Sequence, residues 1–159
     1  MNIFYLDRSP SIAAQYHCDK HVVKMILEYA QLMSTAHVVL DNEQVAYKST
    51  HKNHPSAIWA RQSDYNYRWL YELFRGVCVE YTSRYGKIHM TESKFSLTLS
   101  QLPKNITMGP FTNPPQCMPD KYKGNDTVIA YQSYYNGEKV KFAKWKNGNT
   151  PPWFKVENN

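Results

Sequence analysis

The stretch YHCDKHVVKMILE, residues 16–28, carries four side chains that could transfer protons or form an imine. His17, His21, Lys24 and Glu28 recur at steps of four, three and four residues. At about 100° per residue, these positions fall on one narrow face of a helix. Histidine titrates near neutral pH, so two histidines beside a lysine and a glutamate supply general acids and bases. The spacing predicts either the working face of an enzyme or the solvated face that most helices present to water.

The same stretch could also bind a metal ion. His17 and His21 have the spacing with which one helix can hold a metal. In zinc proteases with this spacing, however, a glutamate directly follows the first histidine, and here Cys18 occupies that position. The sequence therefore predicts neither a metal centre nor another cofactor. If a metal did bind, further ligands could come from Glu28, His51 or His54.

Helical periodicity predicts the element that positions this face. Ser9 followed by Pro10 is typical of an N-cap with proline in the first turn. Apolar side chains then recur at four- and three-residue steps as far as Ala36. We expect a first helix that runs to about Val39 and is broken near residues 18–19.

Three further segments have helical signals. Ser63 can cap a second long helix, and Gly86 can end it, because glycine readily adopts the left-handed conformation of a helix terminus. A shorter helix is expected over residues 91–101, and a last one over residues 127–146, after a stretch rich in proline and glycine. The sequence thus predicts an all-α fold, a single compact domain over residues 1–159 with three main helices and long irregular connections.

Composition favours a nucleic-acid partner. The 159-residue chain has a net charge of +6, and 14% of its residues are aromatic. Lysines gain affinity by displacing counterions from phosphates, and aromatic rings stack on bases. The three cysteines are widely spaced, and no apolar run approaches the roughly 18 residues of a membrane span. We therefore expect a cytoplasmic DNA-binding protein without a membrane partner, and the sequence leaves its oligomeric state open.

Two basic segments are the candidate contacts with nucleic acid. The loop THKNHPSAIWAR, residues 50–61, concentrates cationic groups around a proline. The tail EKVKFAKWKNGNTPPWFKV, residues 138–156, interleaves lysines with aromatic rings that could stack beside an extruded base. The alternatives without a binding role are an exposed polar loop for residues 50–61 and, for the tail, tryptophans that pack the last helix onto the core. The candidate contacts are His51, Lys52, His54, Arg61, Lys144, Trp145, Lys146 and Trp153.

The order of these segments resembles the small phage-type pyrimidine-dimer DNA glycosylases with abasic-site lyase activity, and also a group of tailed-phage proteins. MNIFYL is similar to that family's amino-terminal lead, and AAQYH falls where the family has a histidine-bearing first helix. NYRWLYELFRGVCVEYTSRYGKIH is similar to its long second helix, and PPWFKV to its aromatic carboxyl-terminal segment. The resemblance implies a helical protein that kinks duplex DNA and flips a base.

The resemblance also implies a mechanism. In the family, the amino-terminal amine attacks the sugar, aided by a glutamate on the first helix, and forms an imine that leads to strand cleavage. An α-amino group suits this role because it is partly unprotonated near neutral pH. The family's processed terminal residue is small, whereas Asn2 after Met1 should leave the methionine in place, so the implied nucleophile is the Met1 amine.

A second departure concerns the glutamate. The family's glutamate aligns closest to Lys24, and Glu28 follows one turn later. Either Glu28 takes the role, or Lys24 supplies the amine, or the chemistry differs. The implied function is a base-excision DNA N-glycosylase and abasic-site lyase for damaged or modified pyrimidines, in the host cytoplasm if the protein is phage-encoded. The alternatives are a non-catalytic phage protein that binds nucleic acid or a host protein, and a nucleotide or modified-base enzyme that uses the same helical face.

Overall fold

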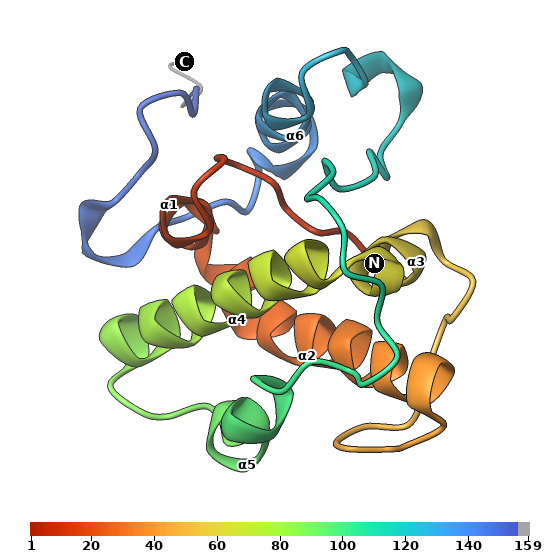
Figure 1. The fold of residues 1–159 in the computed structure, drawn as a ribbon. Coiled ribbons are helices and arrows are strands. Elements are labelled where there is room, and N and C mark those ends of the chain that lie inside the picture. Colours follow the sequence, from red (N-terminus) through yellow and green to blue (C-terminus); the bar gives the residue numbers. More distant parts are fainter. Residues whose placement is uncertain (156–159) are drawn as a thin grey trace.

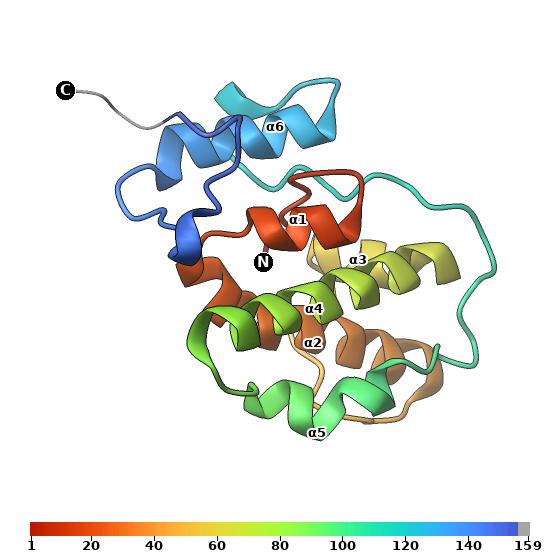
Figure 2. The same cartoon turned by 90° about the vertical axis from the view of Figure 1, so that its left-hand side faces the viewer.

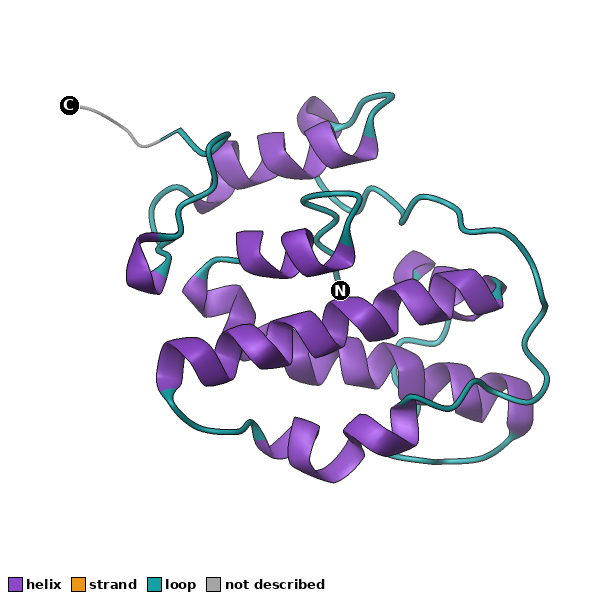
Figure 3. Ribbon diagram, turned by 60° about the vertical axis from the view of Figure 1, so that its left-hand side comes forward, coloured by secondary structure: helices purple, strands orange, loops and turns teal. Residues whose placement is uncertain are grey.

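The computed structural model describes residues 1–155, and this range is all-helical, as predicted (Figure 3). The described range holds six α-helices and no strand, so the expectation of three main helices was wrong. Short 3-10 or π turns supplement them at Asp120–Tyr122 (η1), Tyr135–Lys139 (η2) and Lys146–Gly148 (η3). The α-helices are α1 (Pro10–Tyr16), α2 (Asp19–Asp41), α3 (Pro55–Gln62), α4 (Asp64–Tyr85), α5 (Met90–Leu99) and α6 (Thr127–Tyr134).

The two longest helices, α2 and α4, pack against each other at the centre of the fold (Figure 1). Viewed from the side, α6 and α1 lie at one end of the stack and α5 lies at the other (Figure 2). Helix α1 packs on α4 at Gly76, where an added Cβ would stand only 2.7 Å from the Cβ of Ala14. The non-helical lead, residues 1–9, is also part of the core, since Ile3 and Leu6 are fully buried.

A break separates α1 from α2, close to the predicted position. His17 has extended backbone angles and caps α1, and Cys18 is the N-cap of α2. Arg84 at the end of α4 fixes this joint: its buried guanidinium donates to the carbonyl oxygens of His17 and Gln15. The same guanidinium also pairs with Asp19 and Glu80, at 3.0 and 2.9 Å.

Helix α4 confirms the prediction, and helix α3 was missed. The Ser63 hydroxyl accepts the Asn66 N–H, and Gly86 ends α4 with a φ of 72°. The cap of α3 is unusual, because His54 accepts the Ser56 N–H through its Nδ1 atom. Histidine is not among the residues preferred at this position, and the remaining signal was Pro55 in the first turn, a residue that is also common in loops.

The last helix is much shorter than the expected range of residues 127–146. Asp126 caps α6 as predicted, but the helix gives way to the π turn, and residues 140–145 are not helical. Two tertiary hydrogen bonds draw the chain away: the Trp145 indole donates to the Tyr16 carbonyl, and the Asp19 N–H donates to the Lys144 carbonyl. The tail is therefore attached to the joint between α1 and α2. None of the described helices is long and apolar enough to cross a membrane.

Candidate active site

His17 lies in the core, hydrogen-bonded at both ring nitrogens. Its Nδ1 atom lies 2.7 Å from the Ala13 carbonyl oxygen and its Nε2 atom 2.7 Å from the Tyr29 hydroxyl. Because a carbonyl can only accept, Nδ1 carries the proton, and Nε2 accepts from Tyr29. The Tyr29 oxygen in turn accepts the Phe4 N–H. Burial lowers the pKa of His17 to about 4, so the ring is neutral at pH 7.

His21 forms a second pair, with Tyr135. The Tyr135 oxygen accepts the Cys18 N–H at 3.4 Å and lies 2.5 Å from His21 Nδ1. His21 stacks on Phe4, with ring centroids 4.2 Å apart. Burial above all, together with the nearby charges of His17, Lys139 and Lys24, lowers the pKa of His21 to about 2. His21 is therefore also neutral at pH 7.

The expectation that His17, His21, Lys24 and Glu28 share one helix face was wrong for His17. The break before Asp19 takes His17 out of the helical register and turns it into the core, where it is fully buried. His21 is 6% exposed, so neither histidine belongs to a solvated face. Lys24 and Glu28 remain neighbours on α2, 3.7 Å apart.

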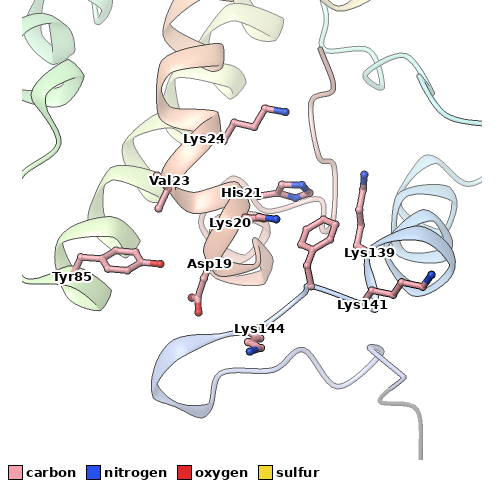
Figure 4. Close-up of a pocket in the computed structure, with 10 residues that line it drawn as sticks. Asp19, Lys20, His21, Val23, Lys24, Tyr85, Lys139, Lys141 and Lys144 are labelled. Carbon is pink, nitrogen blue, oxygen red and sulfur yellow. The ribbon is translucent and has the colours of Figure 1, made fainter.

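One cavity, of about 870 Å³, lies beside the first turns of α2, and we call it the lysine cavity. Figure 4 shows His21 and Lys24 pointing from α2 toward the side on which Lys139 lies. The ammonium group of Lys20 lies 4.7 Å from the ring centroid of Phe142, which forms an apolar part of the wall. The lysine cavity is lined by Asp19, Lys20, His21, Val23, Lys24, Tyr85, Lys139, Lys141, Phe142 and Lys144.

A second cavity, of about 590 Å³, lies farther along α2, and we call it the amine cavity because Met1 lines it. It shares Val23 and Lys24 with the lysine cavity. Glu28 also lines it, and its buried Oε2 atom accepts no hydrogen bond from the described residues. The amine cavity is lined by Met1, Val23, Lys24, Leu27, Glu28, Gln31, Tyr47, Thr50, His51, His89, Met90 and Thr91.

The start of the chain is held by α3. The Ser56 hydroxyl donates to the Met1 carbonyl oxygen at 2.8 Å. Burial above all, together with the charges of the Met1 amine and His51, lowers the pKa of His54, so the amine lies near His54. Glu28, within the described residues, forms its ion pair with Lys24 rather than with the Met1 amine.

The predicted loop contacts fall into different environments. His51 lines the amine cavity in the left-handed backbone region, with a φ of 48°, which is rare for a residue with a side chain. His54 caps α3, and Lys52 is exposed to solvent. Arg61, on α3, is half-buried, and its Nη1 atom has no hydrogen-bond partner among the described residues.

The predicted tail contacts also separate. Lys144 and Lys146 are exposed, whereas Trp145 is only 7% exposed and packs beside Phe154. Trp153 is half-buried and contacts the rings of Tyr16 and Tyr135. Both tryptophans therefore pack the tail onto the fold. The final residue of the quoted PPWFKV segment, Val156, lies outside the described residues.

A family model described as pyrimidine dimer DNA glycosylase matches residues 1–93. The chain belongs to this family. The family's description suggests a DNA glycosylase-type function with DNA as the substrate. No curated protein and no solved structure matches the chain.

The two cavities differ in how much of their lining falls within the range that matches the family model. Every residue that lines the amine cavity falls within residues 1–93, the part that the glycosylase family shares. The lysine cavity takes Lys139, Lys141, Phe142 and Lys144 from beyond that range. The amine cavity therefore belongs to the family's common part, and one wall of the lysine cavity comes from the tail.

The amine cavity can support chemistry at an electrophilic carbon. Its lining residues include two that carry a primary amine, Met1 and Lys24, and one that carries a carboxylate, Glu28. Over residues 1–155 the structure contains no group of three or more His, Cys, Asp or Glu side chains placed to hold a metal ion. The groups available there are nucleophilic amines, an acid–base carboxylate and the imidazoles of His51 and His89.

Sequence reasoning missed several residues that build these sites. Tyr29 and Tyr135 fix the two histidines, and Arg84 fixes the joint on which both lie. Tyr135 is 114 residues from its partner His21, so no local spacing could have paired them. Lys139 and Lys141 did carry a signal, because they belong to the alternation of lysines and aromatic rings in the tail.

Proposed function

We propose that the chain is a DNA N-glycosylase with abasic-site lyase activity that acts on damaged or modified pyrimidines in duplex DNA. One observation carries the proposal: the first residue of the chain and Glu28 of α2 line the same cavity. An amine beside a carboxylate is what attack on a sugar carbon requires. Membership of the glycosylase family supports the same assignment.

The proposed reaction begins at the Met1 amine. The nitrogen lone pair bonds to C1′ of the deoxyribose, and the glycosidic bond breaks, with its electron pair leaving on the base. The sugar ring then opens to give an imine, and loss of a proton from C2′ expels the 3′ phosphate. Glu28 is suited to accept protons and to stabilise the cationic imine, because its buried Oε2 atom accepts no hydrogen bond from the described residues.

Lys24 has two roles open to it. Its ammonium group pairs with Glu28 at 3.7 Å and would orient the carboxylate. It is also a primary amine at the edge of the same cavity, so it could form the imine in place of Met1.

The first experiment is borohydride trapping of the purified protein on duplex oligonucleotides that carry an abasic site or a thymine dimer. Borohydride reduces an imine to a stable secondary amine, and mass mapping locates the adduct. We expect the adduct on the Met1 amine, and an adduct on Lys24 would reassign the nucleophile. A folded protein that binds DNA and gives no adduct would overturn imine chemistry and favour a binding role.

A matched pair of variants tests the carboxylate. Glu28→Gln removes the charge with little change of shape, and we expect the rate of trapping to fall by about 10²- to 10⁴-fold. Glu43→Gln makes the same change at an exposed site outside the amine cavity and should trap at the normal rate. Equal rates for Glu28→Gln and the unsubstituted protein would exclude Glu28 from the reaction.

DNA binding is proposed to use exposed cations around the two cavities. Lys52 in the loop and Lys144 and Lys146 in the tail are exposed and free to reach phosphates. His51 at the amine cavity would meet the sugar or the phosphate next to it. We propose the host cytoplasm as the place of action, because all three cysteines are free, as expected in a reducing compartment.

A further inference from the structure

Apart from Lys24, which lines both cavities, the lysine cavity has no role in the amine chemistry, yet its lining is strongly cationic. Five lysines border it: Lys20, Lys24, Lys139, Lys141 and Lys144. Its one carboxylate, Asp19, is already engaged, because it pairs with Arg84 and accepts the Lys146 N–H. The charge that the cavity offers to a ligand is therefore positive, and the ligand should be an anion.

The cavity also contains a fixed hydrogen-bond donor. The Tyr135 oxygen accepts the Cys18 N–H, and its own proton points to His21 Nδ1 at 2.5 Å, because the nearby Cys18 thiol is a much weaker acceptor. Nδ1 is thus unprotonated, and the neutral ring of His21 carries its proton on Nε2. His21 lines the cavity and is only 6% exposed, so it is 94% buried. Its Nε2 atom nevertheless has no hydrogen-bond partner among residues 1–155.

Both features fit a phosphate. Ammonium groups on flexible stems neutralise charge without imposing direction, whereas an imidazole N–H held by stacking and by Tyr135 selects the position of one oxygen. The Phe142 ring, with the ammonium group of Lys20 at 4.7 Å and that of Lys139 at 5.8 Å from its centroid, gives the cavity an apolar wall. A sugar or a base attached to the phosphate could lie against that wall.

We propose that the lysine cavity is a phosphate-binding site in which His21 Nε2–H donates the directional hydrogen bond and the lysines neutralise the charge. On the proposed function, the ligand is a phosphodiester of the DNA strand whose damaged nucleotide occupies the amine cavity. Val23 and Lys24 line both cavities, so one strand can pass from one to the other along α2.

The direct test follows the histidine ring nitrogens by ¹⁵N NMR while inorganic pyrophosphate is added. We expect the Nε2-protonated form for His21 and the Nδ1-protonated form for His17. Pyrophosphate should shift the His21 signals and leave those of His17, which is fully buried, in place. His21 signals that do not move, or that move together with those of His17, would overturn the site.

Variants test the ligand assignment with a duplex that carries a tetrahydrofuran abasic analogue, which cannot form an imine. His21→Phe keeps a ring against Phe4 but removes the donor, and we expect DNA affinity to fall about tenfold. Combined Lys139→Ala and Lys141→Ala should lower the slope of log affinity against log salt by about two. Lys94→Ala, an exposed lysine on α5, is the matched control and should have at most the small effect of one distant charge.

The outcomes separate this site from the proposed chemistry. Pyrophosphate that shifts His21 and competes with the duplex supports a phosphodiester site, even if borohydride trapping fails. If pyrophosphate shifts the His21 signals but does not compete with the duplex, the ligand of the lysine cavity is a free phosphate or nucleotide and not the DNA strand. Duplex affinity and salt slope that stay unchanged in the His21 and lysine variants would exclude the DNA strand from this cavity.

Discussion

Two histidine–tyrosine pairs beside the joint between α1 and α2 use the same groups for different purposes. His17 and Tyr29 form a closed chain in which both ring nitrogens and the hydroxyl are bonded within the core. His21 and Tyr135 form an open one, because His21 Nε2 has no partner among the described residues and the ring lines the lysine cavity. A buried histidine is therefore informative about function only when one of its nitrogens is left for a ligand.

Removing the support that the two pairs share should have the largest effect. Arg84→Met leaves the carbonyls of Gln15 and His17 and the carboxylates of Asp19 and Glu80 without their buried donor. We expect the free energy of unfolding to fall by about 3–5 kcal/mol, measured by urea denaturation. Arg75→Met is the control: Arg75 pairs with Glu92 nearer the surface, and its loss should cost less than about 1 kcal/mol.

Deleting each tyrosine hydroxyl should distinguish the closed pair from the open one. Tyr29→Phe leaves the buried Phe4 N–H and His17 Nε2 without partners, and should cost about 2–3 kcal/mol of stability. Tyr135→Phe should cost only about 1 kcal/mol, because its bond to the Cys18 N–H is long and water in the cavity can reach His21. Thermal or urea unfolding checks both values. Equal losses would contradict the distinction between the two pairs.

Acid should destabilise the protein through both pairs. The folded-state pKa values of about 4 for His17 and about 2 for His21 lie below the unfolded value near 6.5. The unfolded chain therefore binds more protons below pH 6.5, so stability is full above that pH and falls as pH decreases. As the pH falls from 6.5 to 5, each histidine should lower the free energy of unfolding by about 2 kcal/mol, as measured by urea unfolding at several pH values.

The same titration can isolate His21. His21→Phe should lose its share of the pH dependence and keep that of His17. Added pyrophosphate should reduce the share of His21 alone, because an anion in the lysine cavity favours the protonated ring. A pH dependence that is identical with and without the His21 side chain would show that this ring is not held neutral by burial.

The smallest effect on stability is expected at Lys24, which lines both cavities. Its side chain is 70% exposed and 3.7 Å from Glu28, so Lys24→Ala should change the free energy of unfolding by less than about 0.5 kcal/mol. We nevertheless expect turnover on damaged duplex DNA to be lost, as measured by strand cleavage. Lys94→Ala should retain both stability and turnover, and normal cleavage by Lys24→Ala would remove Lys24 from the site.

Local sequence signals predicted the elements whose ends are chemically marked. The Ser63 cap and the Gly86 terminus follow from side-chain chemistry within a few residues, whereas the break before α2 is held by Arg84 of α4. Helix α3 was missed because proline, here Pro55, marks the end of a loop as readily as the first turn of a helix. The last helix was overextended because its early end is determined by contacts between Trp145 and Tyr16 and between Lys144 and Asp19, which no local pattern contains.

The sequence by itself determined the helical class, the basic charge, and a distant resemblance to the glycosylase family, which the match of the family model over residues 1–93 confirms. It also placed Lys24 and Glu28 together, because residues four apart on a helix are always neighbours. Only the tertiary structure decided that His17 belongs to the core while His21 faces a cavity, and that Met1 lines the same cavity as Glu28. The physical reason is separation along the chain: helical geometry fixes contacts within one or two turns, whereas Tyr135, Arg84 and Met1 reach the site only through packing of the whole fold.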